Sequence, residues 1–446
     1  MIYCKRCLYP ANHPYGLIFD EQGVCSGCRV HEEKDTLDWE ARFKILERIA
    51  EINTRNSTGK GFDCIVPITG GGDSYFIVHT VKHVLGMNPL LVNYNPHYNT
   101  KIGIRNLANL ATTFDCDFIQ STVSPAHLQR ITRHTLRRFG SMYWQVLAGT
   151  LTFPVQTAVK FRTPLIIWGV HPWSDQTGMF SHLDAVEMTE RARVEHGLMG
   201  IAAHDLIDES AGITRHDMLP FAYPDDQHLE AIGVRGIYLS NFIRWDSKAQ
   251  HEKMIDLYGY QTAAQQRTFN TYEDVHCFHS AGVHDYIKFL KLGYSKVTDH
   301  ASREIRLGRM TREEGIKQVK RFTEIKPADL PLFLEWVNMS EDEFMQCISN
   351  RRDPVIWEKI GYEWRLRDSV IHHVNDEGVD IVRVPNHEEC TFHITPSAEK
   401  NAIEDSYLLM GRGYFDKYNY GARHDQPEGG FMSPRSYVLP PLVKKS

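Results

Sequence analysis

The stretch that most constrains the fold is residues 65–74, where an apolar run ends in three consecutive glycines before a helical pattern begins. The apolar run predicts a buried strand, and the apolar spacing over residues 74–85 predicts a helix. Glycines allow a tight turn and bring bare N–H groups close to a ligand. The positive end of the helix dipole points at the same place, so the turn is suited to binding phosphate.

The turn itself reads Thr69-Gly70-Gly71-Gly72-Asp73-Ser74. Ser74 can cap the helix and offer its hydroxyl to phosphate, and Asp73 can hold Mg²⁺ on phosphate oxygens. The pattern resembles S-G-G-x-D-S, the pyrophosphate-binding PP-loop of enzymes that cleave ATP between the α and β phosphates, with Thr69 in the usual serine position. The resemblance implies an adenylating enzyme that uses Asp73 and Ser74 in catalysis. A structural turn without a ligand is the alternative.

Strand and helix patterns alternate after this turn. The expected strands are residues 63–68, 89–94, 117–123 and 164–170, and the expected helices are 74–85, 100–114, 125–139 and 144–161, after an earlier helix at 35–53. Such alternation predicts an α/β fold with a doubly wound parallel sheet. Ligands bind at the carboxyl ends of such strands, which places Asn93 and Gly169 beside the glycine turn in an ATP pocket. Asn93 would border adenine mainly through its backbone, or be an ordinary loop asparagine.

Four of the nine cysteines form two C-x₂-C pairs, Cys4 with Cys7 and Cys25 with Cys28, separated by 17 residues. This spacing predicts a zinc ribbon with a structural Zn²⁺; a redox dithiol or an iron–sulfur cluster are the alternatives. Residues 23–27 also fit G-x-C-x-G, the elbow of a glutaminase nucleophile. Turn-like residues before it and Cys28 after it favour zinc, and isoleucine at position 2 excludes an N-terminal nucleophile. We therefore expect no glutaminase within this chain.

Length and charge narrow the class of protein. A chain of 446 residues has room for two or three domains, and a net charge of −6 argues against extended nucleic-acid binding. Neither a signal peptide nor a membrane span is recognisable, so we expect a cytoplasmic protein. The predicted parts are a zinc ribbon at 1–35, a PP-loop ATP pyrophosphatase domain at 60–250, a helical substrate or partner region at 251–370 and an appended region of unknown role at 371–446.

The helical region carries a group of basic residues, Lys288, Arg303 and Arg306. Guanidinium groups bind diphosphates in bidentate fashion, so these residues are candidates for a nucleotide-sugar or ATP phosphate contact. A solvated basic face is the alternative. The looser segment 175–228 is either a lid or an interaction surface, and the histidines and acids at 171–184 match no metal-ligand template.

Together these features resemble the N-acetyl sugar amidotransferase family, which makes acetamidino sugars for bacterial surface polysaccharides and nonulosonic acids. The resemblance covers about residues 1–370, and the stretch 284–314 is the most particular to the family. It is carried by residues 3–7, 23–28, 69–74, 93–96, 106–110, 269–273 and 284–314.

The resemblance implies ATP-dependent conversion of an acetamido group into an acetamidino group through an adenylated intermediate, with release of AMP and pyrophosphate. The substrate would be a nucleotide-sugar or a nonulosonic acid, and the cofactors ATP, Mg²⁺ and structural Zn²⁺. Ammonia would come from a separate glutaminase subunit, with a channel-forming partner as the family indicates. Two rivals remain: a tRNA-thiolating enzyme, which needs a reactive cysteine and a basic face, and a non-catalytic scaffold subunit.

Overall fold

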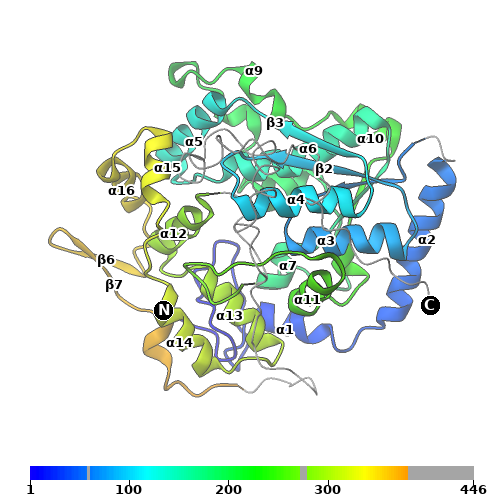
Figure 1. Ribbon diagram of the computed structural model, residues 1–446. Coiled ribbons are helices and arrows are strands. Elements are labelled where there is room, and N and C mark those ends of the chain that lie inside the picture. Colours follow the sequence, from blue (N-terminus) through cyan, green and yellow to red (C-terminus); the bar gives the residue numbers. More distant parts are fainter. Residues whose placement is uncertain (58–60, 272–278, 380–446) are drawn as a thin grey trace, which may run out of the picture.

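A five-stranded parallel sheet lies at the centre of the computed structural model, which describes residues 1–57, 61–271 and 279–379 (Figure 1). The strand order is β3-β2-β1-β4-β5, and all neighbours pair in parallel. The strands are β1 (Cys64–Pro67), β2 (Pro89–Asn95), β3 (Phe118–Thr122), β4 (Leu165–Trp168) and β5 (Arg235–Tyr238). The chain winds from β1 towards β3 and then returns to β4 and β5, so the winding direction reverses beside β1. The predicted doubly wound α/β fold is confirmed.

Side chains of β1 alternate between two hydrophobic cores, one on each face of the sheet. Cys64 and Val66 share a core with apolar residues of four helices, whereas Ile65 packs with α6 on the other face. The helices of the first face are α2 (Trp39–Ser57), α3 (Gly72–His79), α4 (Lys101–Thr113) and α11 (Ser247–Tyr258), and α6 spans Trp144–Phe161. This two-sided burial explains the nearly continuous apolar sequences of β1 and β4.

The predicted elements of the sheet domain occur with ends shifted by a few residues, and α5 (Pro125–Phe139) and α6 match their predicted bounds. Strand β5 was not predicted. It is only four residues long, and Gly236 lies inside it because a Cβ there would come within 2.8 Å of the Met188 Cβ. The Met188 N–H also donates to the Gly236 carbonyl at 2.8 Å. Contact with a distant segment, rather than local pattern, specifies this strand.

The segment between β4 and β5 consists of short helices and turns. Its helices are α7 (Pro172–Thr177), α8 (Glu190–Ala192), α9 (Arg215–Met218) and α10 (Asp226–Ile232). Leu206, Ile213 and Phe221 are buried and share a hydrophobic core with residues of α5 and α6. This packing gives the segment a structural role, whichever of the two predicted functional roles it also has.

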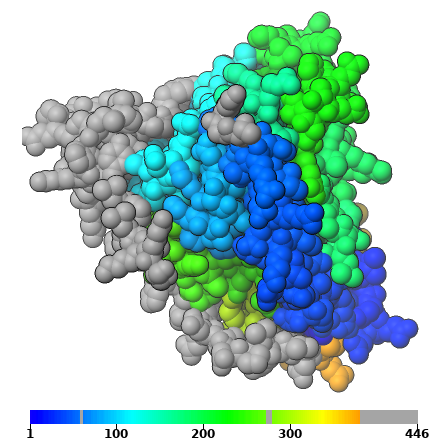
Figure 2. Space-filling model, turned by 90° about the vertical axis from the view of Figure 1, so that its right-hand side faces the viewer, coloured from blue at the N-terminus to red at the C-terminus, as the bar shows by residue number. Residues whose placement is uncertain are grey.

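The N-terminal part packs on both the sheet domain and the C-terminal helices. Helix α1 spans Ser26–Glu33, and the helix predicted at 35–53 is α2. Figure 2 shows the N-terminal segment, in blue, running along one face of the molecule. At the other end of this segment, Leu8 is buried among apolar residues of α13 (Lys296–Arg306) and α14 (Arg312–Phe322). The Leu8 N–H donates to the Ser302 hydroxyl at 3.2 Å.

The C-terminal part is helical up to Ser349, as predicted, and ends in an unpredicted hairpin. Its other helices are α12 (Ala281–Leu292), α15 (Leu330–Val337) and α16 (Glu341–Ser349), and strands β6 (Trp357–Ile360) and β7 (Glu363–Leu366) pair antiparallel. Thr311 and Glu314 form a capping box at the start of α14. Most of the predicted appended region at 371–446 lies outside the described residues. Among the residues described, no helix has the length and apolar character needed to cross a membrane.

Candidate functional site

The glycine turn follows β1 at the carboxyl end of the sheet, and each of its first two glycines has a distinct geometry. Gly70 has a φ of +81°, and a Cβ on it would lie 2.9 Å from the Leu107 backbone nitrogen. Both facts exclude a side chain at this position. Gly71 is the N-cap of α3, with ordinary extended backbone angles. Gly72 and Asp73 are the first two residues of α3, and N–H groups at this place in a helix favour an anion.

Ser74 is not the helix cap that the sequence predicted. Helix α3 begins two residues earlier, at Gly72, because glycines at 71 and 72 enter the first turn without a steric penalty. Ser74 is buried in that turn, and its hydroxyl oxygen accepts the Thr69 N–H at 3.0 Å. The Thr69 hydroxyl lies 3.4 Å from the Ser74 hydroxyl, so the two side chains close the loop. Thr69 is exposed, which leaves room for its extra methyl group.

Asp73 points out of the first turn of α3 with its side chain 38% exposed. One carboxylate oxygen lies 2.7 Å from Nε2 of His251, a residue of α11 that is 1% exposed. Sequence reasoning missed His251, because 178 residues separate it from Asp73 and it belongs to no motif. The exposed part of the carboxylate is suited to binding a hard cation such as Mg²⁺.

Asn93 and Gly169 lie at the carboxyl ends of β2 and β4. Asn93 is buried; its amide donates to the Ile68 carbonyl at 2.8 Å, and its carbonyl accepts from Gln120 at 2.8 Å. The side chain thus connects the ends of three strands, which leaves backbone atoms for any contact with adenine. A Cβ on Gly169 would come within 2.9 Å of the Ile77 side chain on α3. The edge of β4 therefore packs closely against the helix that carries the glycine turn.

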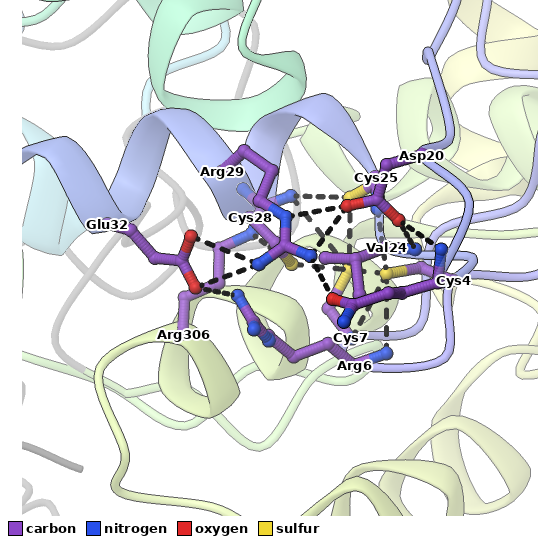
Figure 3. Close-up of polar contacts among 11 residues, drawn as sticks. Cys4, Arg6, Cys7, Asp20, Val24, Cys25, Cys28, Arg29, Glu32 and Arg306 are labelled. Carbon is purple, nitrogen blue, oxygen red and sulfur yellow. Dashed lines mark hydrogen bonds and ion pairs between the residues drawn. The ribbon is translucent and has the colours of Figure 1, made fainter. Parts of the chain in front are cut away.

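The four paired cysteines form one cluster in the structure (Figure 3). Cys4, Cys7, Cys25 and Cys28 are all buried, and their sulfur atoms lie within 4.8 Å of one another. Sγ atoms of Cys4 and Cys28 are 4.0 Å apart, and those of Cys7 and Cys25 are 3.6 Å apart. Tetrahedral zinc with Zn–S bonds of about 2.3 Å requires sulfur separations of about 3.8 Å. The donor set fits a metal ion of this kind.

Groups that stabilise negative sulfur surround the cluster. The Cys4 sulfur accepts N–H groups from Arg6, Cys7 and Cys25 at 3.3–3.4 Å. Arg306, from the last turn of α13, directs its guanidinium at the sulfurs of Cys28, Cys25 and Cys7 at 3.4, 3.6 and 3.9 Å. Since four thiolates around Zn²⁺ carry a net charge of about −2, a buried cation beside them offsets part of that charge.

This placement corrects the prediction for Arg306. The sequence indicated a phosphate or substrate contact, but the guanidinium is enclosed by the cysteines, lies over the Tyr9 ring at 5.2 Å and donates to the Asp175 carbonyl at 2.9 Å. Distance along the chain hid the cysteine partners, which lie 278 residues away or more.

An outer layer of ion pairs holds the loops of the cysteine cluster together (Figure 3). Arg29 pairs with Asp20, and Arg6 and Arg29 both pair with Glu32 of α1. Asp20 accepts the N–H of Val24 at 2.9 Å, and this bond is the main cause of a lowered pKa of its carboxyl. These contacts fix the backbone around Cys25 and so the direction of its thiol.

The other two basic candidates form ion pairs inside the protein. Lys288 pairs with Asp299 at 2.6 Å, and the Arg303 guanidinium lies 3.5 Å from the Asp175 carboxylate. Asp175 also pairs at 2.8 Å with Lys34, the C-cap residue of α1. Burial opposes ionisation of Asp175, yet the charges of Lys34 and Arg303 hold the pKa of its carboxyl well below its usual range. The two pairs of Asp175 join α7 to the end of α1 and to α13.

The polar residues at 171–184 are part of this packing. The Nδ1 atom of His171 accepts the Ser174 N–H at 3.2 Å and caps α7, while burial lowers the pKa of His171 to about 4. The cavity beside His171 and His182 has a volume of about 10 Å³, which is room for about a single water molecule. The arrangement agrees with hydrogen-bonded polar residues rather than a second metal site.

The parallel sheet and its connections define a doubly wound α/β protein, and the turn at residues 69–74 resembles a PP-loop in sequence. Residues 266–370 match the family model described as LPS biosynthesis protein WbpG-like, C-terminal domain. This match includes the stretch 284–314, on which the predicted family resemblance most depends, and it confirms that resemblance for this part of the chain. No curated protein matches the sequence.

Three solved structures resemble the chain at low identity and low structural score. The NH3-dependent NAD synthetase from Campylobacter jejuni shares 10% identity, with 44% of this chain and 92% of that chain covered and a TM-score of 0.25. The NMN synthetase from Francisella tularensis shares 13% identity over 51% and 98%, with a TM-score of 0.25. The NAD+ synthetase from Burkholderia pseudomallei shares 12% identity over 53% and 98%, with a TM-score of 0.26. Scores in this range carry no argument about activity.

Proposed function

We propose that the chain is an ATP-dependent amidotransferase that converts an acetamido group of a nucleotide-sugar or nonulosonic acid into an acetamidino group. One observation carries the proposal: a glycine turn with an exposed carboxylate, Asp73, lies at the switch point of the sheet, in a chain whose residues 266–370 match a lipopolysaccharide-biosynthesis domain. A nucleotide site and a surface-polysaccharide domain in one chain point to ATP-driven modification of a sugar.

The reaction needs activation because an acetamido oxygen is a poor leaving group. In the first step this oxygen attacks the α-phosphorus of ATP, and the bond from that phosphorus to the bridging oxygen breaks and releases pyrophosphate. Loss of the amide N–H proton to solvent leaves a neutral imidoyl adenylate. In the second step ammonia adds to the imidoyl carbon, and the C–O bond to AMP breaks. Loss of one proton gives the neutral acetamidine, so oxygen has been exchanged for NH.

Residues of the glycine turn would bind the leaving pyrophosphate. The N–H groups of Gly72 and Asp73 lie in the first turn of α3, where helix geometry leaves them without intrahelical partners. Ser74 lies in the same turn and closes it through Thr69. Mg²⁺, when bound at Asp73, offsets charge on the phosphate oxygens. Gly70 holds the backbone in the conformation that this turn requires.

Zn²⁺ is proposed as a structural ion at Cys4, Cys7, Cys25 and Cys28. Its role would be to tie the N-terminal loops to α13 through Arg306, which contacts three of the four sulfurs. The same cluster bears on the source of ammonia. Cys25, the cysteine of the G-x-C-x-G sequence, is fully buried with its sulfur 3.6 Å from that of Cys7. It is therefore unsuited to glutamine attack, and we propose a separate glutaminase as the ammonia supplier.

The test is a reaction of the purified chain with Mg-ATP, ammonium and a panel of UDP-diacetamido sugars and nonulosonic acids. We expect AMP, pyrophosphate and a product about one mass unit lighter, and we expect Asp73→Asn to abolish all three. Formation of AMP with no sugar product, or no AMP with any panel member, would contradict the proposal. Glutamine-dependent turnover by the chain alone would contradict the separate glutaminase.

A further inference from the structure

We propose that His251 is a positioning residue that fixes the Asp73 carboxylate for binding of Mg-ATP, an inference that rests on the proposed function. Nε2 of His251 and one Asp73 oxygen are 2.7 Å apart. Because a carboxylate only accepts hydrogen bonds, Nε2 carries the hydrogen and donates it. His251 comes from α11 and Asp73 from the first turn of α3, so the bond links two helices at the glycine turn.

Gly72 provides independent support for this role. The PP-loop pattern S-G-G-x-D-S leaves the residue before the aspartate open, and this chain has glycine there. A Cβ on Gly72 would lie 2.6–2.7 Å from three ring atoms of His251. The imidazole thus occupies the volume that any other residue at position 72 would need. The volume of the His251 ring requires glycine at position 72, whereas the positive φ of Gly70 requires glycine at position 70.

The surroundings hold the imidazole in one orientation. His251 is 1% exposed, and its ring lies 6.0 Å from the Tyr260 ring in an edge-to-face arrangement. A buried ring in contact with backbone on one side and an aromatic ring on the other has little freedom to rotate. Since its donor is fixed, the accepting oxygen of Asp73 is fixed as well.

The consequence concerns the rest of the Asp73 carboxylate. One oxygen is engaged by His251, and the side chain as a whole keeps 38% of its surface exposed at the first turn of α3. A preoriented carboxylate loses less rotational freedom when it binds a cation, and hydrogen-bonded second-shell partners of this kind typically contribute about 10–100-fold in metal affinity. His251 therefore acts through Asp73 and needs no contact with ATP.

Two amide variants separate positioning from packing. In His251→Gln the side-chain amide reaches the Nε2 position and keeps a donor for Asp73; in His251→Asn the amide reaches only the Nδ1 position. His79→Ala is the matched control, because Nδ1 of His79 lies 2.6 Å from the Tyr258 hydroxyl and joins the same two helices at the far end of α3. Mg-ATP binding is measured by calorimetry at several Mg²⁺ concentrations, without any sugar, and circular dichroism checks folding.

We expect His251→Asn to weaken Mg-ATP binding at least tenfold and to raise the Mg²⁺ concentration required, with His251→Gln within about threefold of wild type. His79→Ala should lower thermal stability and leave the affinity unchanged. The inference would be overturned if His251→Asn bound Mg-ATP as tightly as wild type, or if His251→Gln or His79→Ala lost as much affinity as His251→Asn. In each of these cases wild-type binding of Mg-ATP would leave the proposed function standing. Absence of Mg-ATP binding by the wild type would overturn both.

Discussion

Replacement of Arg306 by methionine tests whether the cysteine cluster holds a metal ion whose charge this residue offsets. Methionine keeps much of the aliphatic volume and removes the guanidinium, which contacts three sulfurs between 3.4 and 3.9 Å. Removing one partner of a buried charge pair costs about 3–5 kcal/mol of stability. Loss of a second-shell group costs about 10–100-fold in metal affinity. That range corresponds to about 1.4–2.7 kcal/mol of zinc-binding free energy.

The assay compares Arg306→Met with Arg309→Met, which removes a neighbouring, partly buried arginine that pairs with Glu304 and Asp246. Zinc affinity is measured by competition with a chromophoric chelator, and stability by urea unfolding. We expect both variants to unfold at lower urea concentration, and only Arg306→Met to lose at least tenfold in zinc affinity. An affinity of Arg306→Met within threefold of wild type would refute the charge argument, as would equal losses in the two variants.

Three further predictions concern stability. Gly70→Ala should lower the free energy of unfolding in urea by at least about 2 kcal/mol, because of the left-handed backbone and the contact with Leu107. Gly71→Ala, whose Cβ would meet only the Thr69 hydroxyl at 3.5 Å, should lower it by less than about 1 kcal/mol. Equal losses in the two variants would contradict this. The pKa of His171 is about 4 in the folded protein and 6.5 ordinarily, so its contribution is complete above about pH 6.5 and is lost as the pH falls towards 4. His171→Asn, which keeps an N-cap acceptor, should flatten the stability–pH curve over that window by up to about 3 kcal/mol, and an unchanged curve would count against it. Chelation of the metal should raise hydrogen exchange in α13 and leave β2 protected; uniform protection would argue against a structural ion.

The sheet domain could be predicted because its signals are local. Each strand core is a short apolar run, and each helix carries its own period, so β1 to β4 and α3 to α6 are specified within a few residues of sequence. Strand β5 and the β6–β7 hairpin were not predicted, since four-residue strands with glycine or charged residues depend on tertiary contacts.

The candidate site was only partly predictable for the same reason. The glycine turn and the cysteine pairs are compact motifs, and the residues that complete each one come from far along the chain. His251 reaches Asp73 across 178 residues, and Arg306 reaches Cys28 across 278. No periodicity or motif spacing marks either contact. From the sequence alone, Arg306 is therefore grouped with the basic residues near it in the chain. The glycine at position 72, which the S-G-G-x-D-S pattern does not require, was a sign in the sequence that another residue packs there.

The contacts of Leu8 and Cys28 with α13 affect the order in which native contacts form during synthesis on the ribosome. The Leu8 N–H bonds to Ser302, so the cysteine module and its packing partner are separated by 294 residues. At about 5–20 residues per second, roughly 15–60 s pass between the emergence of the two. During that interval the thiols of the cysteine cluster lack the contact with Arg306, and Leu8 lacks its apolar neighbours on α13. The cysteine module therefore reaches its native contacts late, only after α13 has been synthesised.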